Sequence, residues 1–230
     1  MSDQPPEVSV VIPVYNEEEN VAPLAEEVKA ALEAAGKSFE LIYVDDGSSD
    51  ATAARCEAIE YVTTIRHERN QGQSAATITG IAAAKAPVIV TLDGDGQNDP
   101  SAIPALLEAL KEHDVAVGYR RERNDTLSRR MASRFAYRVR NLFLRDRIVD
   151  IGCSLRAFPR DEGLKLPQFD GLHRLMPAIF TFRGLSVAQL PTEHRARTHG
   201  VSKYGNLKRG FRGLFDLMGL MWLKRRTIRG

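Results

Sequence analysis

The sequence predicts an α/β protein with a mostly parallel central sheet and helices on both faces. Two observations carry this prediction. Short, apolar, β-branched runs alternate with segments of helical spacing through the first half of the 230-residue chain, as in successive strand–helix–strand units. In addition, a carboxylate-bearing loop follows three of the apolar runs. Ligands of such sheets bind beyond the carboxyl ends of the strands, where these loops would gather.

The elements of the first half follow from that alternation. Apolar runs predict strands over Val8–Val14, Phe39–Val44, Tyr61–Arg66, Val88–Leu92 and Asp114–Gly118. The intervening segments predict helices over 21–32, Ala51–Ile59, Ser74–Lys85 and Ser101–Glu112. We expect Asn16 to cap the first helix together with Glu19, and Asp50 to cap the second.

The pattern is less regular after residue 118. We expect a helix around Ser128–Leu144, a short apolar segment over Asp150–Phe158 and a strand over Leu185–Leu190. The tail predicts a helix from about Leu207. The expected organisation is therefore one domain over residues 1–206 followed by an amphipathic, basic helix over 207–230.

Charge is divided unevenly between the two halves of the chain. Residues 1–114 contain 7 Lys/Arg and 21 Asp/Glu, whereas residues 115–230 contain 25 and 9. An acidic half suited to a metal therefore adjoins a basic half suited to an anion or an anionic surface. The two cysteines fit a reducing cytoplasm. We expect no signal peptide and no membrane span, since no long apolar run is present.

Missing motifs exclude several classes of nucleotide and hydrolase site. No G-x-G-x-x-G follows the first strand, and neither a P-loop nor a G-x-S-x-G elbow occurs. The most informative stretch is instead Asp93-Gly94-Asp95-Gly96-Gln97, directly after a predicted strand. Two neighbouring carboxylates repel unless a cation lies between them, and oxygen ligands suit Mg²⁺ or Mn²⁺. A solvated Asp/Gly turn is the alternative.

Five blocks of sequence resemble glycosyltransferase family 2, which has the Rossmann-like GT-A fold. They are most similar to its polyprenyl-phosphate sugar transferases, the dolichol-phosphate mannosyltransferase and undecaprenyl-phosphate aminoarabinose transferase type. The blocks run in family order across nearly the whole chain. They are Val8–Glu17, Val44–Asp50, Leu92–Gln97, Asp150–Phe158 and Arg197–Tyr204.

The resemblance implies a site for a nucleotide-diphosphate sugar. Asp93 and Asp95 would be the catalytic residues and, with Gln97, would bind Mg²⁺ or Mn²⁺ and the diphosphate. Asp45 would accept a hydrogen bond from the base; the alternative is that Asp45 and Asp46 only stabilise a turn. Where the family usually has D-A-D-L-Q, the extra glycines are expected to loosen the loop. The implied nucleotide-sugar pocket comprises Pro13, Val14, Tyr15, Glu17, Asp45, Asp93 and Gly94.

The resemblance also points to the acceptor. Family members that use hydroxyl acceptors carry a Glu-Asp pair whose Asp serves as base, but this chain has Gly171-Leu172-His173-Arg174 at that place. A phosphate monoester is already ionised near neutral pH and needs cations rather than a base. The resemblance implies that a polyprenyl phosphate is held by Arg120, Arg129, Ser133, Arg197 and Lys203.

The tail predicts contact with a membrane surface. Apolar residues recur at helical spacing between two basic clusters, as in an interfacial helix drawn to anionic lipid; they are Phe211, Leu214, Phe215, Met218, Met221 and Trp222. A helix buried against the domain is the alternative. Similar proteins continue into transmembrane helices here, whereas this chain ends at Gly230. We therefore expect a peripheral protein on the cytoplasmic face of the cell membrane, with a separate membrane protein or further copies as candidate partners.

The predicted activity is an inverting, metal-dependent transfer of a sugar from a nucleotide diphosphate to a polyprenyl phosphate. One rival keeps the fold but uses a hydroxyl acceptor, on a polysaccharide or a glycolipid. The rival of another class is a non-catalytic module that binds a membrane or nucleic acid through its basic residues. That rival would leave the acidic loop at Asp93 without a role, so nucleic acid is not an expected partner.

Overall fold

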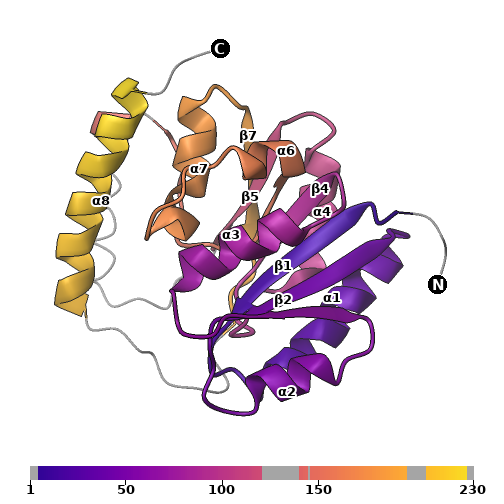
Figure 1. The fold of residues 1–230 in the computed structure, drawn as a ribbon. Coiled ribbons are helices and arrows are strands. Elements are labelled where there is room, and N and C mark those ends of the chain that lie inside the picture. Colours follow the sequence, from indigo (N-terminus) through magenta and orange to yellow (C-terminus); the bar gives the residue numbers. More distant parts are fainter. Residues whose placement is uncertain (1–4, 121–139, 145, 196–205, 227–230) are drawn as a thin grey trace.

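The computed structural model of the chain describes residues 5–120, 140–144, 146–195 and 206–226, with the backbone alone for 206–214. A seven-stranded sheet in the order β3-β2-β1-β4-β6-β5-β7 lies at its centre (Figure 1). Of these strands, β6 runs antiparallel to its neighbours β4 and β5, and the other pairs are parallel. The strands are β1 (Val8–Val14), β2 (Phe39–Asp45), β3 (Val62–Arg66), β4 (Val88–Thr91), β5 (Val115–Arg120), β6 (Arg156–Pro159) and β7 (Val187–Thr192).

Helices cover both faces of the sheet, as predicted (Figure 1). One face carries α1 (Val21–Ala34), α2 (Thr52–Glu57), the short 3₁₀ turn η1 (Pro100–Ala102) and α4 (Ile103–Ala109). The other carries α3 (Gln73–Ala83), α6 (Arg160–Leu164), α7 (Leu172–Phe182) and α8 (Asn206–Arg226). The sheet needs apolar side chains on both faces, which explains why its central strands are continuous apolar runs.

Burial alternates along β1 in the way that this three-layer arrangement requires. Val10 and Ile12 belong to the apolar cluster beneath α1, whereas Val11 belongs to the cluster beneath α3 and α7. All three side chains are fully buried. The period-two alternation of strand side chains thus connects two separate cores through one sheet.

The strand predictions are confirmed with small shifts, and one cap prediction is wrong. Helix α1 begins at Val21, with Asn20 at its N-cap position. Asn16 instead has a positive φ of 53° and accepts a hydrogen bond from the Ser49 N–H at 2.9 Å. It therefore joins the loops after β1 and β2. Ala51 is at the N-cap position of α2, but Asp50 before it does accept the N–H of Thr52, the first residue of the helix, at 3.0 Å.

The second half holds elements that the sequence pattern did not predict. Helix α7 includes Pro177, a residue that disfavours helix interiors, yet seven of its residues are buried and packing outweighs propensity. Residues 140–144 are helical, and the rest of the helix expected over Ser128–Leu144 lies outside the described residues. Across the ranges that the structure describes, no helix combines the length and apolarity needed to cross a bilayer.

Two helical glycines differ in the space around them. A Cβ at Gly80 of α3 would lie 2.3 Å from Cγ1 of Val11 in β1, so only glycine allows this close helix–sheet contact. A Cβ at Gly219 of α8 would meet nothing within 4 Å. Glycine costs about 1 kcal/mol relative to alanine inside a helix, so only packing justifies it at Gly80.

We predict opposite effects for alanine at these two sites. Gly80→Ala lowers the free energy of unfolding by about 1–3 kcal/mol, because overpacking exceeds the gain in helix propensity. Gly219→Ala, the matched control, raises it by up to about 1 kcal/mol. Urea titration followed by circular dichroism measures both. Equal stabilisation by the two variants would contradict the close approach of α3 to β1.

Candidate active site

The carboxylate loops gather at the place where the strand order reverses. From β1 the chain passes to β2 and β3 on one side, and then crosses to β4 on the other side of β1. Val14 at the end of β1 lies opposite Asp45 at the end of β2. The crevice beyond β1 and β4 is where open α/β sheets bind ligands. The loops after β1, β2 and β4 all border it.

Gly94 fixes the loop after β4 against the end of β1. A Cβ there would lie 2.5 Å from Cγ1 of Val14 and 3.0 Å from the carbonyl oxygen of Pro13. The expectation that the glycines loosen this loop is therefore wrong for Gly94, which permits a tight contact between two backbone segments. Gly96 differs, since its φ of 69° requires a residue that tolerates the left-handed region.

Asp93 is the most constrained carboxylate of this loop. Its Oδ1 accepts a hydrogen bond of 2.5 Å from Nε2 of Gln73 at the start of α3, and its N–H donates to Oγ of Ser154 at 3.0 Å. Burial and the nearby charge of Asp95 raise the pKa of Asp93 to about 6, despite the buried guanidinium of Arg156. A carboxylate that is costly to ionise is typical of a site built for a positive ligand.

Asp95 and Gln97 form the outer part of the same loop. The N–H of Gln97 donates to Oδ1 of Asp95 at 3.2 Å. The side chain and carbonyl of Gln97 both bond the backbone of Arg195, at 3.4 and 2.9 Å. Arg195 in turn pairs with Glu27 on α1 and with Asp99, and thereby holds the chain after β7 beside the acidic loop.

This donor set fits a divalent cation that also binds phosphate. Within the described part of the chain, no group of three or more His, Cys, Asp or Glu side chains could enclose a metal ion. Mg²⁺ commonly takes only one or two carboxylates and completes its shell with water and substrate phosphates. The neighbouring carboxylates of Asp93 and Asp95 would supply the one or two carboxylate ligands that such an ion takes.

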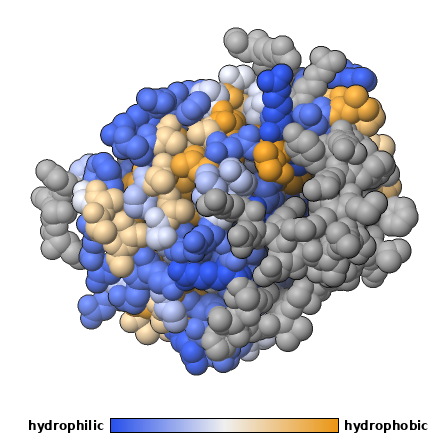
Figure 2. All heavy atoms as spheres, turned by 180° about the vertical axis from the view of Figure 1, so that it is seen from behind, coloured by the Kyte–Doolittle hydropathy of each residue, from blue (hydrophilic) through white to orange (hydrophobic). Residues whose placement is uncertain are grey.

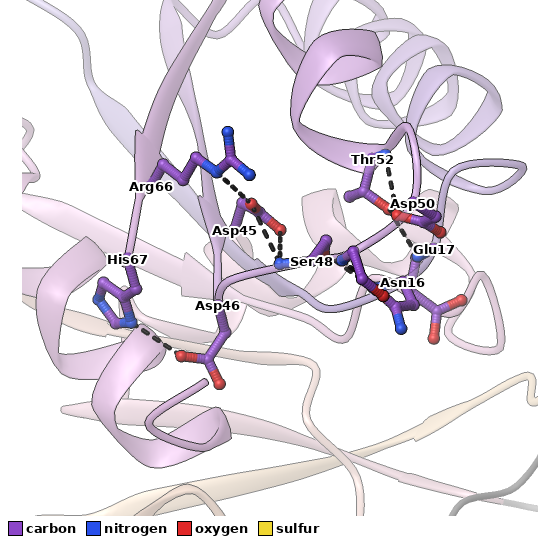
Figure 3. Close-up of polar contacts among 10 residues, drawn as sticks. Asn16, Glu17, Asp45, Asp46, Ser48, Asp50, Thr52, Arg66 and His67 are labelled. Carbon is purple, nitrogen blue, oxygen red and sulfur yellow. Dashed lines mark hydrogen bonds and ion pairs between the residues drawn. The ribbon is translucent and has the colours of Figure 1, made fainter. Parts of the chain in front are cut away.

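The two adjacent aspartates after β2, Asp45 and Asp46, have different partners (Figure 3). Asp46 accepts hydrogen bonds from Nδ1 of His67 at 2.8 Å and from the N–H groups of Gln71 and Gly72 at 2.9 and 2.7 Å. These bonds confirm the alternative of a turn-stabilising residue for Asp46. They also fix the loop that delivers Gln73 to Asp93.

Asp45 retains capacity for a ligand. Its carboxylate is buried and accepts the Ser48 N–H at 3.2 Å, and Nε of Arg66 lies 3.4 Å from Oδ2 (Figure 3). The side chain of Arg66 is 58% exposed, so this ion pair faces solvent and is weak. Asp45 itself is fully buried, and its partner Arg66, which the sequence pattern did not single out, is the solvent-facing side of the pair.

The other predicted nucleotide residues lie along the rim of the crevice. Pro13 and Val14 end β1 and contact the Gly94 loop, and Tyr15 follows them half-buried. The N–H of Glu17 donates to Oγ1 of Thr52 at 2.8 Å, and its Oε2 accepts from Nδ2 of Asn20 at 2.7 Å. The fold thus brings all of the predicted nucleotide-sugar residues to the ends of β1, β2 and β4.

The predicted acceptor residues are only partly described. Arg120 makes a bidentate ion pair with Asp150, with Nε–Oδ2 and Nη2–Oδ1 distances of 2.7 and 2.9 Å. Its guanidinium is therefore already oriented by a carboxylate, which the sequence pattern did not reveal. The other four, Arg129, Ser133, Arg197 and Lys203, lie outside the described residues.

The residues that the sequence reasoning missed are those that support the carboxylates. Gln73 and Ser154 hold Asp93, and Arg195 connects the acidic loop to α1. Gln73 is the first residue of α3, and a polar residue at a helix start was the one available signal. Nothing in the local sequence of Arg195 or Ser154 indicates these contacts.

The mostly parallel sheet with helices on both faces is the Rossmann-like GT-A fold. A structure of glucosyl-3-phosphoglycerate synthase from Mycobacterium tuberculosis with phosphoglyceric acid matches with a TM-score of 0.72 and 19% identity, over 95% of this chain and 80% of that one. A second, with Mn²⁺ and UDP-glucose, has a TM-score of 0.71 and 20% identity, over 96% and 79%. At such identities the likeness shows the fold alone.

The chain belongs to glycosyl transferase family 2, whose family model matches residues 9–162. It is 37% identical over 97% of its length to dodecaprenyl-phosphate galacturonate synthase of Rhizobium johnstonii. It is 35% identical over 87% to undecaprenyl-phosphate 4-deoxy-4-formamido-L-arabinose transferase of Edwardsiella ictaluri. The match spans 69% of the first relative and 64% of the second. The predicted family and its polyprenyl-phosphate subgroup are confirmed.

The raised pKa of Asp93 predicts a carboxylate that costs stability. The folded protein holds the Asp93 proton more tightly than the unfolded chain, so its destabilising effect appears as the pH rises from about 4 to about 6. Without metal, we expect Asp93→Asn to raise the free energy of unfolding by about 2 kcal/mol at pH 7.5 and by nearly nothing at pH 4.

Urea titrations of the metal-free protein at the two pH values measure this effect. Asp161→Asn serves as the matched control, because Asp161 is exposed on α6 and should change stability little at either pH. A loss of stability in Asp93→Asn at pH 7.5 would show that hydrogen bonding outweighs the cost of the buried charge.

Proposed function

We propose that this protein transfers a sugar from a nucleotide-diphosphate sugar to a polyprenyl phosphate, with inversion and with the help of a divalent cation. One observation carries the proposal. In a chain 35–37% identical to polyprenyl-phosphate sugar transferases, the predicted donor-binding residues converge on the crevice where the strand order reverses. The printed names of those relatives support the acceptor class.

The donor would lie across the ends of β1, β2 and β4. Asp45 accepts hydrogen bonds from the nucleoside, and the ligand displaces its solvent-facing partner Arg66. Asp93 and Asp95 would hold Mg²⁺ or Mn²⁺, which supplies Lewis acidity that neutralises the leaving diphosphate. Gln73 keeps Asp93 oriented for this role through its 2.5 Å hydrogen bond.

The acceptor phosphate needs cations and no general base, because it is largely dianionic at neutral pH. The basic second half of the chain provides the cations, with Arg120 as the described member. Arginine binds phosphate through two parallel N–H donors, and Asp150 pre-orients the Arg120 side chain for such a contact. The acceptor oxygen then attacks the anomeric carbon from the face opposite the diphosphate.

Helix α8 supplies a face for the membrane that carries such a lipid. Leu217 and Leu220 lie on the inner side of α8 and are buried. Asp216, also on α8, pairs with Arg174 of α7 at 3.1 Å. On the outer side Phe215, Met218 and Trp222 are 68%, 49% and 64% exposed. The inner face of α8 is therefore buried against the domain, as in the alternative of a buried helix, and its exposed outer face is the surface that we propose for the membrane.

Charge and position suit that outer face to anionic lipid. Arg225 and Arg226 are exposed at the end of α8, and the edge of the molecule there shows both orange and blue side chains (Figure 2). Leu142 and Phe143 add exposed apolar surface near α8, because Leu144 accepts a hydrogen bond from Lys224. An apolar stripe flanked by arginines is typical of helices that lie in the membrane interface.

Loss of one loop carboxylate should remove donor binding. We predict that Mn²⁺ with UDP-glucose, UDP-galacturonic acid or GDP-mannose raises the melting temperature of the protein, by mass action. Asp95→Ala abolishes that shift and lowers sugar transfer to undecaprenyl phosphate at least about 100-fold, whereas Asp161→Ala changes neither. The product should be acid-labile, as glycosyl phosphates are. An acid-stable product would establish a hydroxyl acceptor instead.

The exposed stripe of α8 should carry membrane binding. Replacing Phe215, Met218 and Trp222 together by serine should abolish cosedimentation with vesicles of phosphatidylglycerol and phosphatidylcholine, because burial of apolar area is lost. Leu164→Ser is the matched control, since Leu164 is 46% exposed on α6. Unchanged vesicle binding by the triple variant would overturn the role of α8.

A further inference from the structure

A histidine that the proposed mechanism does not use lies beside the acidic loop. His173 is in the first turn of α7, and its Nδ1 lies 2.7 Å from Oγ of Ser74. The residue before Ser74 is Gln73, which bonds Asp93. Arg156, on the strand next to β4, donates to the carbonyl oxygen of His173. The contacts with Ser74 and Arg156 therefore place His173 close to Gln73, the residue that bonds Asp93.

The hydrogen bonds of Ser74 determine which nitrogen of the ring carries the proton. Oγ of Ser74 accepts the N–H of Gly171 at 3.0 Å and the N–H of His173 at 3.4 Å. These two bonds use both lone pairs of the hydroxyl, so its single proton is donated to Nδ1. Nδ1 must then be unprotonated, and the neutral ring carries its proton on Nε2.

The surroundings of His173 keep it neutral. Burial, together with the charges of Arg174 and Arg156, lowers its pKa to about 3. An imidazole of this kind is a poor general base at neutral pH. It can nevertheless donate a hydrogen bond from Nε2, because the neutral ring carries its one proton there.

The Nε2 end of the ring is left without a partner. Among the residues that the structure describes, no side chain or backbone group bonds Nε2. His173 as a whole is half-buried. The ring is thus fixed at Nδ1 and leaves one N–H for a ligand.

We propose that His173 donates a hydrogen bond from Nε2 to an oxygen of the sugar being transferred. The inference rests on the proposed function, since it needs a nucleotide-sugar donor in the crevice. The sugar is favoured over the acceptor phosphate because His173 is connected to Asp93 through Ser74 and Gln73, on the diphosphate side. A neutral donor also suits a hydroxyl or carboxyl oxygen, whereas a phosphate dianion is better held by arginine.

The test compares the sugar nucleotide with the matching nucleotide diphosphate. The probe is whichever of UDP-glucose, UDP-galacturonic acid and GDP-mannose binds the wild-type protein most tightly with Mn²⁺, measured by titration calorimetry beside UDP or GDP. His173→Ala should weaken binding of the sugar nucleotide about three- to tenfold, the value of one neutral hydrogen bond, and leave the diphosphate unchanged. His173→Gln should recover part of the loss, since its amide can donate.

A control variant and a second readout make the outcomes decisive. His113 is exposed and lies outside the loops that form the site, so His113→Ala should change neither affinity. Equal loss for both ligands, no loss for either, or a loss confined to the KM for undecaprenyl phosphate would overturn the assignment. So would a fall in kcat of about 1,000-fold or more with unchanged binding, which would indicate a base. If the wild-type protein bound none of the three probes, the proposed function would fail together with the inference.

Discussion

The site depends on the repulsion between two neighbouring carboxylates that the fold holds together. Asp93 and Asp95 lie on one short loop, and Gly94 between them allows this loop to pack closely against the end of β1. The chain does not relieve the repulsion by pairing Asp93 with an exposed cation. It supplies a neutral amide from Gln73 and a buried guanidinium from Arg156, and the pKa of Asp93 remains raised. These partners therefore leave a cost to ionising Asp93, which a bound cation would relieve.

The loops around that pair are connected to one another rather than held separately. Asn16 bonds the loop after β2, Asp46 fixes the loop before α3, and Gln73 bonds the loop after β4. Each connection joins the carboxyl ends of two strands. Loops connected in this way constrain one another, and a site formed by such loops loses less entropy when a ligand binds.

Helix α8 shows how the second half divides its tasks. Its inner face adds Leu217 and Leu220 to the core that α3 and α7 cover, while its outer face leaves a tryptophan, a phenylalanine and a methionine exposed. Arg174 neighbours His173 and pairs with Asp216, so the helix that faces the proposed membrane is tied to the segment beside the acidic loop.

The sequence by itself determined the strands, the three-layer class, the family and the set of carboxylate loops. These features depend on near neighbours, since alternation of apolar residues and short motifs are local properties of the chain. Only the tertiary structure decided which carboxylate has which role. Asp46 accepts hydrogen bonds from His67 and two backbone N–H groups, whereas its neighbour Asp45 accepts the Ser48 N–H and pairs with the exposed Arg66, and no local pattern separates them.

Long-range contacts decided the remaining features for the same reason. The Gln73–Asp93 bond joins residues 20 positions apart, the Ser74–His173 bond joins residues 99 apart, and α7 forms despite Pro177 because the sheet buries it. Hydrogen-bond chemistry alone would allow many different partners for such polar groups. Which partner a group has is decided by proximity in the folded structure. The sequence therefore specified the groups that carry charge, and packing specified which of them remain available to a ligand.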